Sequence, residues 1–125
     1  MTPKEYNAMP EGDNKLAVRL AITMGWCASL LYSATQNGDR VFVEDPDDGG
    51  WACTLFNPFT DPSIPFGLIG RGVIRVGQAE YSEKFYAVNG AKQHYFHESK
   101  THAIIQAFCA ADPLGHWARF MKGGE

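Results

Sequence analysis

The sequence has no excess of positive charge, no long apolar run and no even set of cysteines. Its 125 residues carry 11 Lys and Arg against 14 Asp and Glu, which gives a formal net charge of −3. Broad binding to phosphate backbones relies on clustered basic residues, and here Lys84, Lys92 and Lys100 each stand alone. Direct nucleic-acid binding is therefore not expected.

Membrane and export signals are also missing. The longest apolar stretch begins at Leu16 and is interrupted by Arg19, Thr23 and Gly25. It is too short to span a bilayer and has the wrong shape for an export signal. We therefore expect no membrane partner.

The cysteines do not indicate a disulfide framework. Their number is odd, and Cys27, Cys53 and Cys109 each lie among apolar neighbours, as buried thiols do in a reducing compartment. A Cys27–Cys53 bridge between neighbouring strands is the alternative. The cysteines predict a cytoplasmic protein.

The composition is that of a globular chain. Hydrophobic residues make up 45% and charged residues 20%, and a chain of this length can bury a core without a metal or a disulfide. The sequence predicts a single domain over residues 1–125. Within it we expect a flexible N-terminal arm at 1–12, a compact α+β domain at 13–120 and a tail at 121–125.

Local patterns alternate between helix and strand. Apolar stripes predict helices over 15–24 and 100–111, the second with Ser99 as its N-cap, and a last helical turn over 114–120. Turn signals at Asn37-Gly38 and Asn89-Gly90 predict hairpins. Strand-like runs occupy 26–34, 40–44, 51–57, 73–77, 81–90 and 93–98.

A segment rich in proline and glycine, FNPFTDPSIPFGLIGRGVIRV, crosses the middle of the chain at 56–76. Pro62 and Pro65 fit the first turn of a short helix, where a missing N–H costs nothing. The glycines of GLIGRG (67–72) do not follow the G-x-G-x-x-G order, and no Lys-Ser or Lys-Thr comes after them. We expect them to serve turns and close packing.

Several motifs occur in an order that points to a known family. Gly25-Trp26 ends the first helix, F-N-P-x-T-D follows at 56–61, G-L-I and V-I-x-V lie within 67–76, and HAIIQAFCAADPLG forms the last helix at 102–115. Over roughly residues 15 to 115 the chain resembles the phage ABA sandwich domain family, NinX-like small proteins encoded by tailed bacteriophages and prophages.

The resemblance implies an α+β fold: an antiparallel β-sheet with helices packed on both faces, an α/β/α sandwich. It supplies no catalytic residues. Two departures stand out, because Pro62 takes the place of a usual Trp and no acidic residue lies near Arg71.

Three of the four histidines lie in HYFHESKTH (94–102). A metal or enzyme site that uses His94, His97 and His102 is one alternative. However, His94 and His97 are three apart on a predicted strand and point to opposite faces. No metal, cofactor or catalytic residue is predicted, and Cys109, on an apolar helix stripe, is expected to stay protonated and inert.

Aromatic residues are concentrated on two adjacent predicted strands. On an open sheet face they could stack with single-stranded nucleic acid. The basic residues for such a site are sparse, so cross-strand packing in the core is expected instead. These residues are Tyr81, Phe85, Tyr86, Tyr95 and Phe96.

An acidic turn, EDPDDGG (44–50), does not match a calcium loop, because the positions that need ligands hold Gly49 and Phe56. Exposed loop carboxylates can imitate nucleic-acid phosphates toward a basic partner. The predicted binding residues are Glu44, Asp45, Asp47, Asp48 and Trp51.

Together these features predict a non-enzymatic accessory protein of a phage or prophage that binds a host or phage macromolecule in the bacterial cytoplasm. Inhibition of a host defence or nucleic-acid-handling complex is the sharper hypothesis. A small metal-binding protein or enzyme using the three histidines, and a structural role in virion assembly, are the alternatives. A homodimer through an edge strand such as 73–77 stays open.

Overall fold

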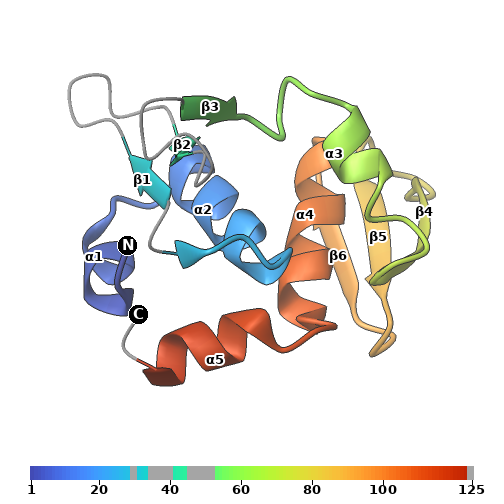
Figure 1. Cartoon of the computed structure of the whole chain (residues 1–125). Helices are drawn as coiled ribbons and strands as arrows, with labels where there is room; N and C mark the ends of the chain where they lie inside the picture. Colours follow the sequence, from blue (N-terminus) through green and yellow to red (C-terminus); the bar gives the residue numbers. More distant parts are fainter. Residues whose placement is uncertain (29–30, 34–40, 45–52, 124–125) are drawn as a thin grey trace. The chain divides into compact units, whose positions relative to one another are not determined.

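The computed structural model describes residues 1–28, 31–33, 41–44 and 53–123 (Figure 1). The chain divides into two compact units, one made of Met1–Asn57 with Leu114–Glu125 and the other of Pro58–Pro113. A single domain over residues 1–125 stays a prediction.

The first unit holds a three-stranded meander and three helices. Its strands pair antiparallel in the order β1-β2-β3, as the sequence predicts, with Phe42 opposite Tyr32 on one side and Leu55 on the other. The turn at Asn37-Gly38 lies outside the described residues. The elements are α1 (Pro3–Ala8), α2 (Asp13–Thr23), β1 (Leu31–Ser33), β2 (Val41–Glu44), β3 (Cys53–Phe56) and α5 (His116–Gly123).

An aromatic cluster joins the helices of this unit. The rings of Tyr6 and Trp117 meet edge to face with centroids 4.8 Å apart, and the Arg19 guanidinium lies 5.1 Å from the Trp117 centroid. The sequence predicts a flexible arm at 1–12, whereas residues 3–8 form a helix whose Tyr6 is buried. Likewise α5 extends into the predicted tail, because its apolar side packs on α2.

The second unit is a three-stranded antiparallel sheet with a long helix on it. The strands follow the order β4-β5-β6, and α4 packs mainly against the central strand β5. Helix α4 begins where predicted, since Ser99 Oγ accepts a hydrogen bond from the His102 N–H at 3.3 Å. The elements are α3 (Ser63–Phe66), β4 (Val73–Gln78), β5 (Phe85–Asn89), β6 (His94–His97) and α4 (Lys100–Ala111).

One buried side chain, that of Asn89, ties this sheet to its helix. Its Oδ1 accepts hydrogen bonds from the N–H groups of Ala91 (3.0 Å) and Gln93 (3.1 Å). Its Nδ2 donates to the Gln93 side chain at 3.0 Å and to the Ala107 carbonyl of α4 at 3.1 Å. Asn89 is 0% exposed, so these bonds replace water entirely. The predicted turn at Asn89-Gly90 is confirmed.

The proline- and glycine-rich segment forms α3 and the tight approach to β4. Asp61 Oδ1 accepts from the N–H and the hydroxyl of Ser63, at 3.1 and 2.6 Å. Gly70 has φ +88, which favours glycine. A Cβ on Gly72 would lie 2.8 Å from Phe108 Cδ1 and 3.1 Å from Pro113 Cγ. The expectation that these glycines serve turns and close packing is confirmed.

The α+β class with antiparallel strands is confirmed. The arrangement differs from the prediction in two respects, and the first is that the described strands form two three-stranded sheets and not one. In the second sheet, Ala87 and Asn89 face α4 and are buried, whereas Phe96 faces the other side and is 53% exposed. In the described part of Pro58–Pro113, helix α4 therefore covers one face of the sheet only, which is the second difference. The helices among the described residues are all too short or too polar to span a bilayer.

Asn89→Ala should lower the free energy of unfolding by about 2–4 kcal/mol, because the Ala91 and Gln93 N–H groups and the Ala107 carbonyl each lose a hydrogen bond to the buried amide. Asn7→Ala is the control, since Asn7 is exposed on α1 and should change stability by about 0.5 kcal/mol or less. Urea unfolding of both variants measures the difference. Equal losses would contradict the role of the Asn89 amide.

Gly72→Ala should cost about 1–3 kcal/mol, because the new methyl group overpacks the contact with Phe108. Gly90 is the matched control, since a Cβ there would meet nothing within 4 Å. Gly90→Ala should be neutral or stabilising by up to about 1 kcal/mol, as the unfolded chain loses freedom. Thermal unfolding compares the two, and a neutral Gly72→Ala would rule out the close packing.

Candidate functional site

The predicted acidic contact site lies almost wholly outside the described residues. Glu44 ends β2, and its backbone pairs with Cys53 of β3. Asp45, Asp47, Asp48 and Trp51 fall in the segment 45–52, which the structure does not describe. The acidic turn therefore stays a prediction.

Two of the three clustered histidines hold the junction between β6 and α4. The rings of His97 and His102 stack with centroids 4.5 Å apart and an interplanar angle of 10°. His97 Nδ1 accepts a hydrogen bond from the Ser99 N–H at 2.9 Å, and His102 Nδ1 lies 2.7 Å from Ser99 Oγ. Phe59 stacks on His102 at 4.5 Å. These contacts position the first turn of α4.

The third histidine, His94, lies on the other face of the sheet, beside Tyr86. The strand alternation that separates His94 from His97 is the one that the sequence predicts. Among the described residues no three His, Cys, Asp or Glu side chains come together in a way that could hold a metal ion. The alternative site of His94, His97 and His102 is thus split across the sheet.

The cysteines differ in burial. Cys109 is buried on α4, as expected, whereas Cys27 is exposed, so the prediction of a buried Cys27 thiol is wrong. Cys27 follows the end of α2 and lies beyond the helical stripe, which explains why apolar neighbours in sequence did not bury it. Cys53 lies in β3, and its side chain is outside the described residues.

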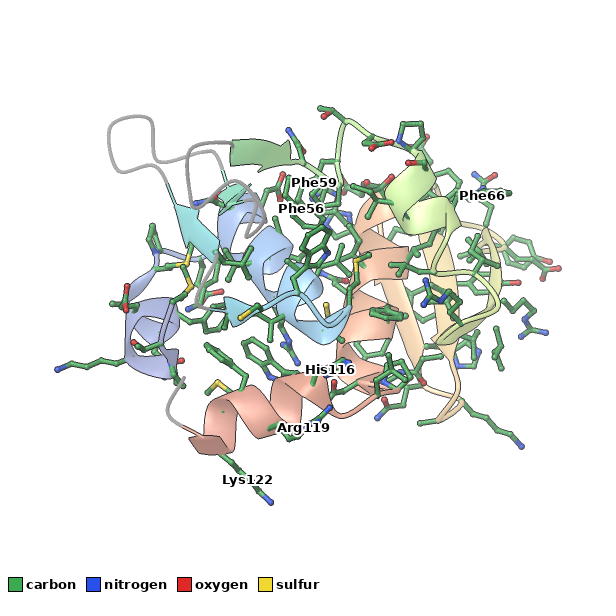
Figure 2. All side chains as sticks on the ribbon, in the orientation of Figure 1. Phe56, Phe59, Phe66, His116, Arg119 and Lys122 are labelled. Atoms are coloured by element: carbon green, nitrogen blue, oxygen red, sulfur yellow. The ribbon has the colours of Figure 1, made fainter. Side chains whose placement is uncertain are left out.

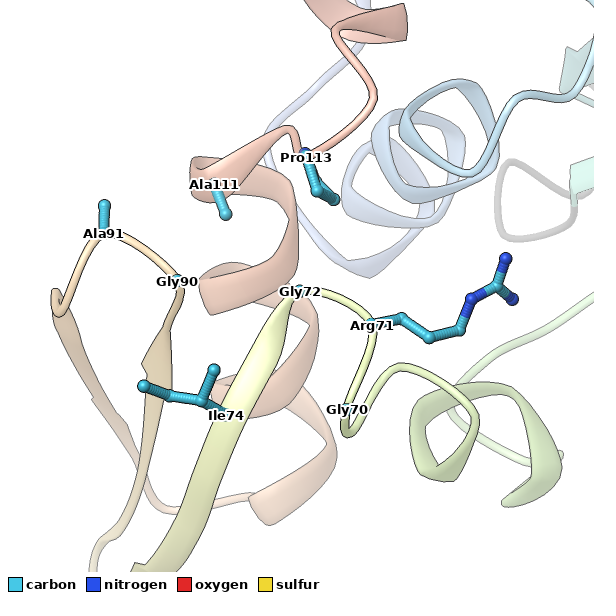
Figure 3. A pocket seen from close by; sticks show the side chains of 8 residues that line it. All are labelled: Gly70, Arg71, Gly72, Ile74, Gly90, Ala91, Ala111 and Pro113. Atoms are coloured by element: carbon cyan, nitrogen blue, oxygen red, sulfur yellow. The ribbon is translucent and has the colours of Figure 1, made fainter.

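A hollow of about 310 Å³ lies at one end of the second unit (Figure 3). Glycine, alanine, isoleucine and proline line most of it, and the Arg71 side chain extends away from Gly90 and Ala91. The N–H groups there are already used: Gly70 donates to Val73, Gly90 donates to Gly72, and Ala91 donates to Asn89. The backbone N–H groups of Gly70, Gly90 and Ala91 are therefore not available to a ligand.

The side of the β4–β5–β6 sheet that faces away from α4 carries a compact aromatic surface, which we call the open face: Arg75, Gly77, Tyr86, His94 and Phe96. The register brings these residues together, because Tyr86 lies opposite Gly77 on one side and Phe96 on the other. Arg75 and His94 flank Val88 in the next row.

The three rings of the open face are evenly spaced. The centroids of Tyr86, His94 and Phe96 are each 6.3 Å from the other two. The rings of His94 and Phe96 are nearly parallel, with an interplanar angle of 17°. The Arg75 guanidinium lies 5.7 Å from the Tyr86 centroid, a cation–π contact.

Gly77 provides the space in which the Tyr86 ring lies. A Cβ on Gly77 would be 2.6 Å from Tyr86 Oη and 2.8 Å from its Cζ. A glycine inside a strand often marks a close approach of another group. Here the approaching group is the hydroxyl end of the Tyr86 ring, which reaches from β5 to Gly77 of β4.

The expectation that the strand aromatics pack in the core is wrong for Tyr81 and Phe96, which are exposed. Phe85, Tyr86 and Tyr95 are half-buried. Tyr95 lies opposite the buried Ala87, whereas Tyr86 lies on the same side of the sheet as Phe96. The sequence left an open face only as the less favoured alternative, because alternation separates two faces without showing which one the helix covers. The glycine at 77 was the available signal.

The comparisons with known proteins do not assign a family. No family model matches the chain, and no solved structure matches it. A probable sucrose-phosphate synthase of Solanum tuberosum is 32% identical over 88 residues, which are 70% of this chain and 8% of that protein. The chain thus spans less than a tenth of the length of this curated relative, and the similarity is confined to that short part.

Proposed function

We propose that the chain is a small phage- or prophage-encoded accessory protein that acts without catalysis, by binding a host or phage macromolecule. The observation that carries the binding role is the open face. Exposed aromatic side chains that gather on one surface mark interaction sites more often than scattered ones do, and Phe96 is 53% exposed between two further rings.

The phage origin and the bacterial cytoplasm as the place of action rest on the resemblance to NinX-like proteins over residues 15–115. The non-enzymatic role is supported by the structural contacts and the burial of the side chains that could take part in catalysis. His97 and His102 are engaged at the start of α4, and Cys109 is buried. Inhibition of a host defence or nucleic-acid-handling complex is the specific form of the proposal.

The open face can be tested by affinity capture from bacterial lysate with matched variants. Phe96→Asp places a charge among the three rings, whereas Phe66→Asp places it on another exposed phenylalanine, in α3 outside the sheet (Figure 2). We expect Phe96→Asp to reduce recovery of the bound macromolecules about tenfold, as loss of an interface anchor does. Phe66→Asp should leave recovery unchanged.

Both variants should melt close to the wild-type temperature, because their side chains are exposed in the native state. Recovery that is equal for the wild type and Phe96→Asp would overturn the assignment of the open face. The lysate should be split and one half treated with nuclease, so that captured proteins and captured nucleic acids are told apart.

The acidic turn is the second candidate surface, and charge reversal tests it. Asp45, Asp47 and Asp48 changed together to Lys should abolish capture of a basic protein partner, because unlike charges across the contact become like charges. Mass spectrometry of the captured proteins gives the measurement. If every co-purifying protein is recovered as before, the acidic turn is not a contact surface.

A further inference from the structure

We propose that the open face binds single-stranded nucleic acid, with two or three bases stacked on Tyr86, His94 and Phe96. This inference rests on the proposed function, since it names the class of macromolecule that the open face takes. It departs from the sequence-based expectation, in which the aromatic residues belong to the core.

The spacing of the rings fits an extended single strand. Alternate residues on one side of a strand are about 6.6 Å apart, and the ring centroids here are 6.3 Å apart. That distance is close to twice the rise of about 3.4 Å between stacked bases in a duplex. Successive bases that have been pulled apart can therefore each meet one ring, as in sheet platforms that stack two or three bases.

The local charge favours a polyanion, although the whole chain is acidic. Residues 58–113 hold five Lys and Arg and five Asp and Glu, so the net charge of −3 comes from the other unit. Arg75 lies on the open face beside Tyr86. Lys84 directly precedes β5, and strand alternation places it on the same side of the sheet as Arg75. Glu98 directly follows β6, and among the described residues it is the one carboxylate that strand alternation places on that side. Arg75 and Lys84 can each approach a phosphate next to a stacked base.

The size of the open face argues against a protein as its occupant, a second copy of this chain included. Strands of four to six residues, spaced about 4.8 Å apart and rising about 3.3 Å per residue, give a face of roughly 250 Å². Stable protein interfaces bury about 800 Å² on each partner. Two or three bases need no more than the face provides.

A site that binds bases mainly by stacking also needs few basic residues. Base–aromatic stacking contributes strongly for every base, whereas each phosphate contact adds to the salt dependence. A site with three rings and two nearby cations should therefore bind weakly, depend strongly on its rings and depend little on salt. For the two phosphates that Arg75 and Lys84 can neutralise, a plot of log K against log salt should have a slope of about −1.4.

The test uses fluorescence anisotropy of labelled oligothymidylate and oligouridylate of about eight nucleotides, with a duplex of the same length as competitor. The full chain should bind the single strands about tenfold more tightly than the duplex or better. Phe96→Ala should weaken binding about tenfold, within the range that loss of one stacked base gives. Phe66→Ala, in α3, should change it less than about twofold.

Gly77→Ala provides a variant that keeps every ring. Its methyl group would lie only 2.6 Å from Tyr86 Oη, so the ring must move away while the backbone of β4 keeps its conformation. We expect the affinity to fall about fivefold or more and the melting temperature to stay within a few degrees. Gly90→Ala, which meets no neighbour, is the matched control and should bind as the wild type does.

Three results would each overturn the inference: no binding of either oligonucleotide, a duplex bound as tightly as a single strand, or affinity that Phe96→Ala and Gly77→Ala leave unchanged. The proposed function has a separate readout. If capture from lysate depends on Phe96 but resists nuclease, the open face binds a protein, so the proposed function stands and this inference fails. If capture does not depend on Phe96, the open face loses both assignments.

Discussion

The second unit depends on the hydrogen bonds of the Asn89 side chain. The amide stands at the end of the central strand, where its oxygen closes the turn into β6 and its nitrogen reaches the Ala107 carbonyl of α4. One residue thus fixes the hairpin and also the face on which the helix lies. An apolar residue could fill the space but would leave buried N–H and C=O groups without partners.

The open face follows from that one-sided attachment. With α4 held against the side of Ala87 and Asn89, strand alternation sends Tyr86, His94 and Phe96 to the other side. Gly77 leaves room for the Tyr86 ring beside the neighbouring strand, and the Arg75 guanidinium lies over that ring. The even spacing of the three rings therefore follows from the strand register and the pleat of the sheet. Both depend on the buried residues Ala87 and Asn89, which face α4.

Local sequence signals predicted the helices, strands and turns well. They did not predict how the strands pair into sheets or which face of a sheet the helix covers. Ser99 as a cap, the turn at Asn89-Gly90 and Gly25 after α2 depend on neighbours in sequence, and the structure places all three as expected. Whether six strands form one sheet or two depends on long-range pairing, which periodicity does not encode. The helical face of the second sheet is likewise decided by a contact between Asn89 and a residue eighteen positions away.

Averaging charge over the chain explains why the sequence argued against a nucleic-acid ligand. A formal charge of −3 describes the whole molecule, but a ligand responds to charges within about one Debye length, roughly 8–10 Å. Within that range the open face presents Arg75 and, by strand alternation, Lys84 and Glu98, next to three exposed or half-exposed rings. Stacking needs π-surfaces more than phosphate contacts, so a chain with few basic residues can still hold a short single strand, provided that its aromatic side chains lie outside the core. His94 and Phe96 satisfy that condition because they are two positions apart on β6 and so lie on the same side of the sheet. The turn before β6, which the Asn89 side chain closes, sets that register.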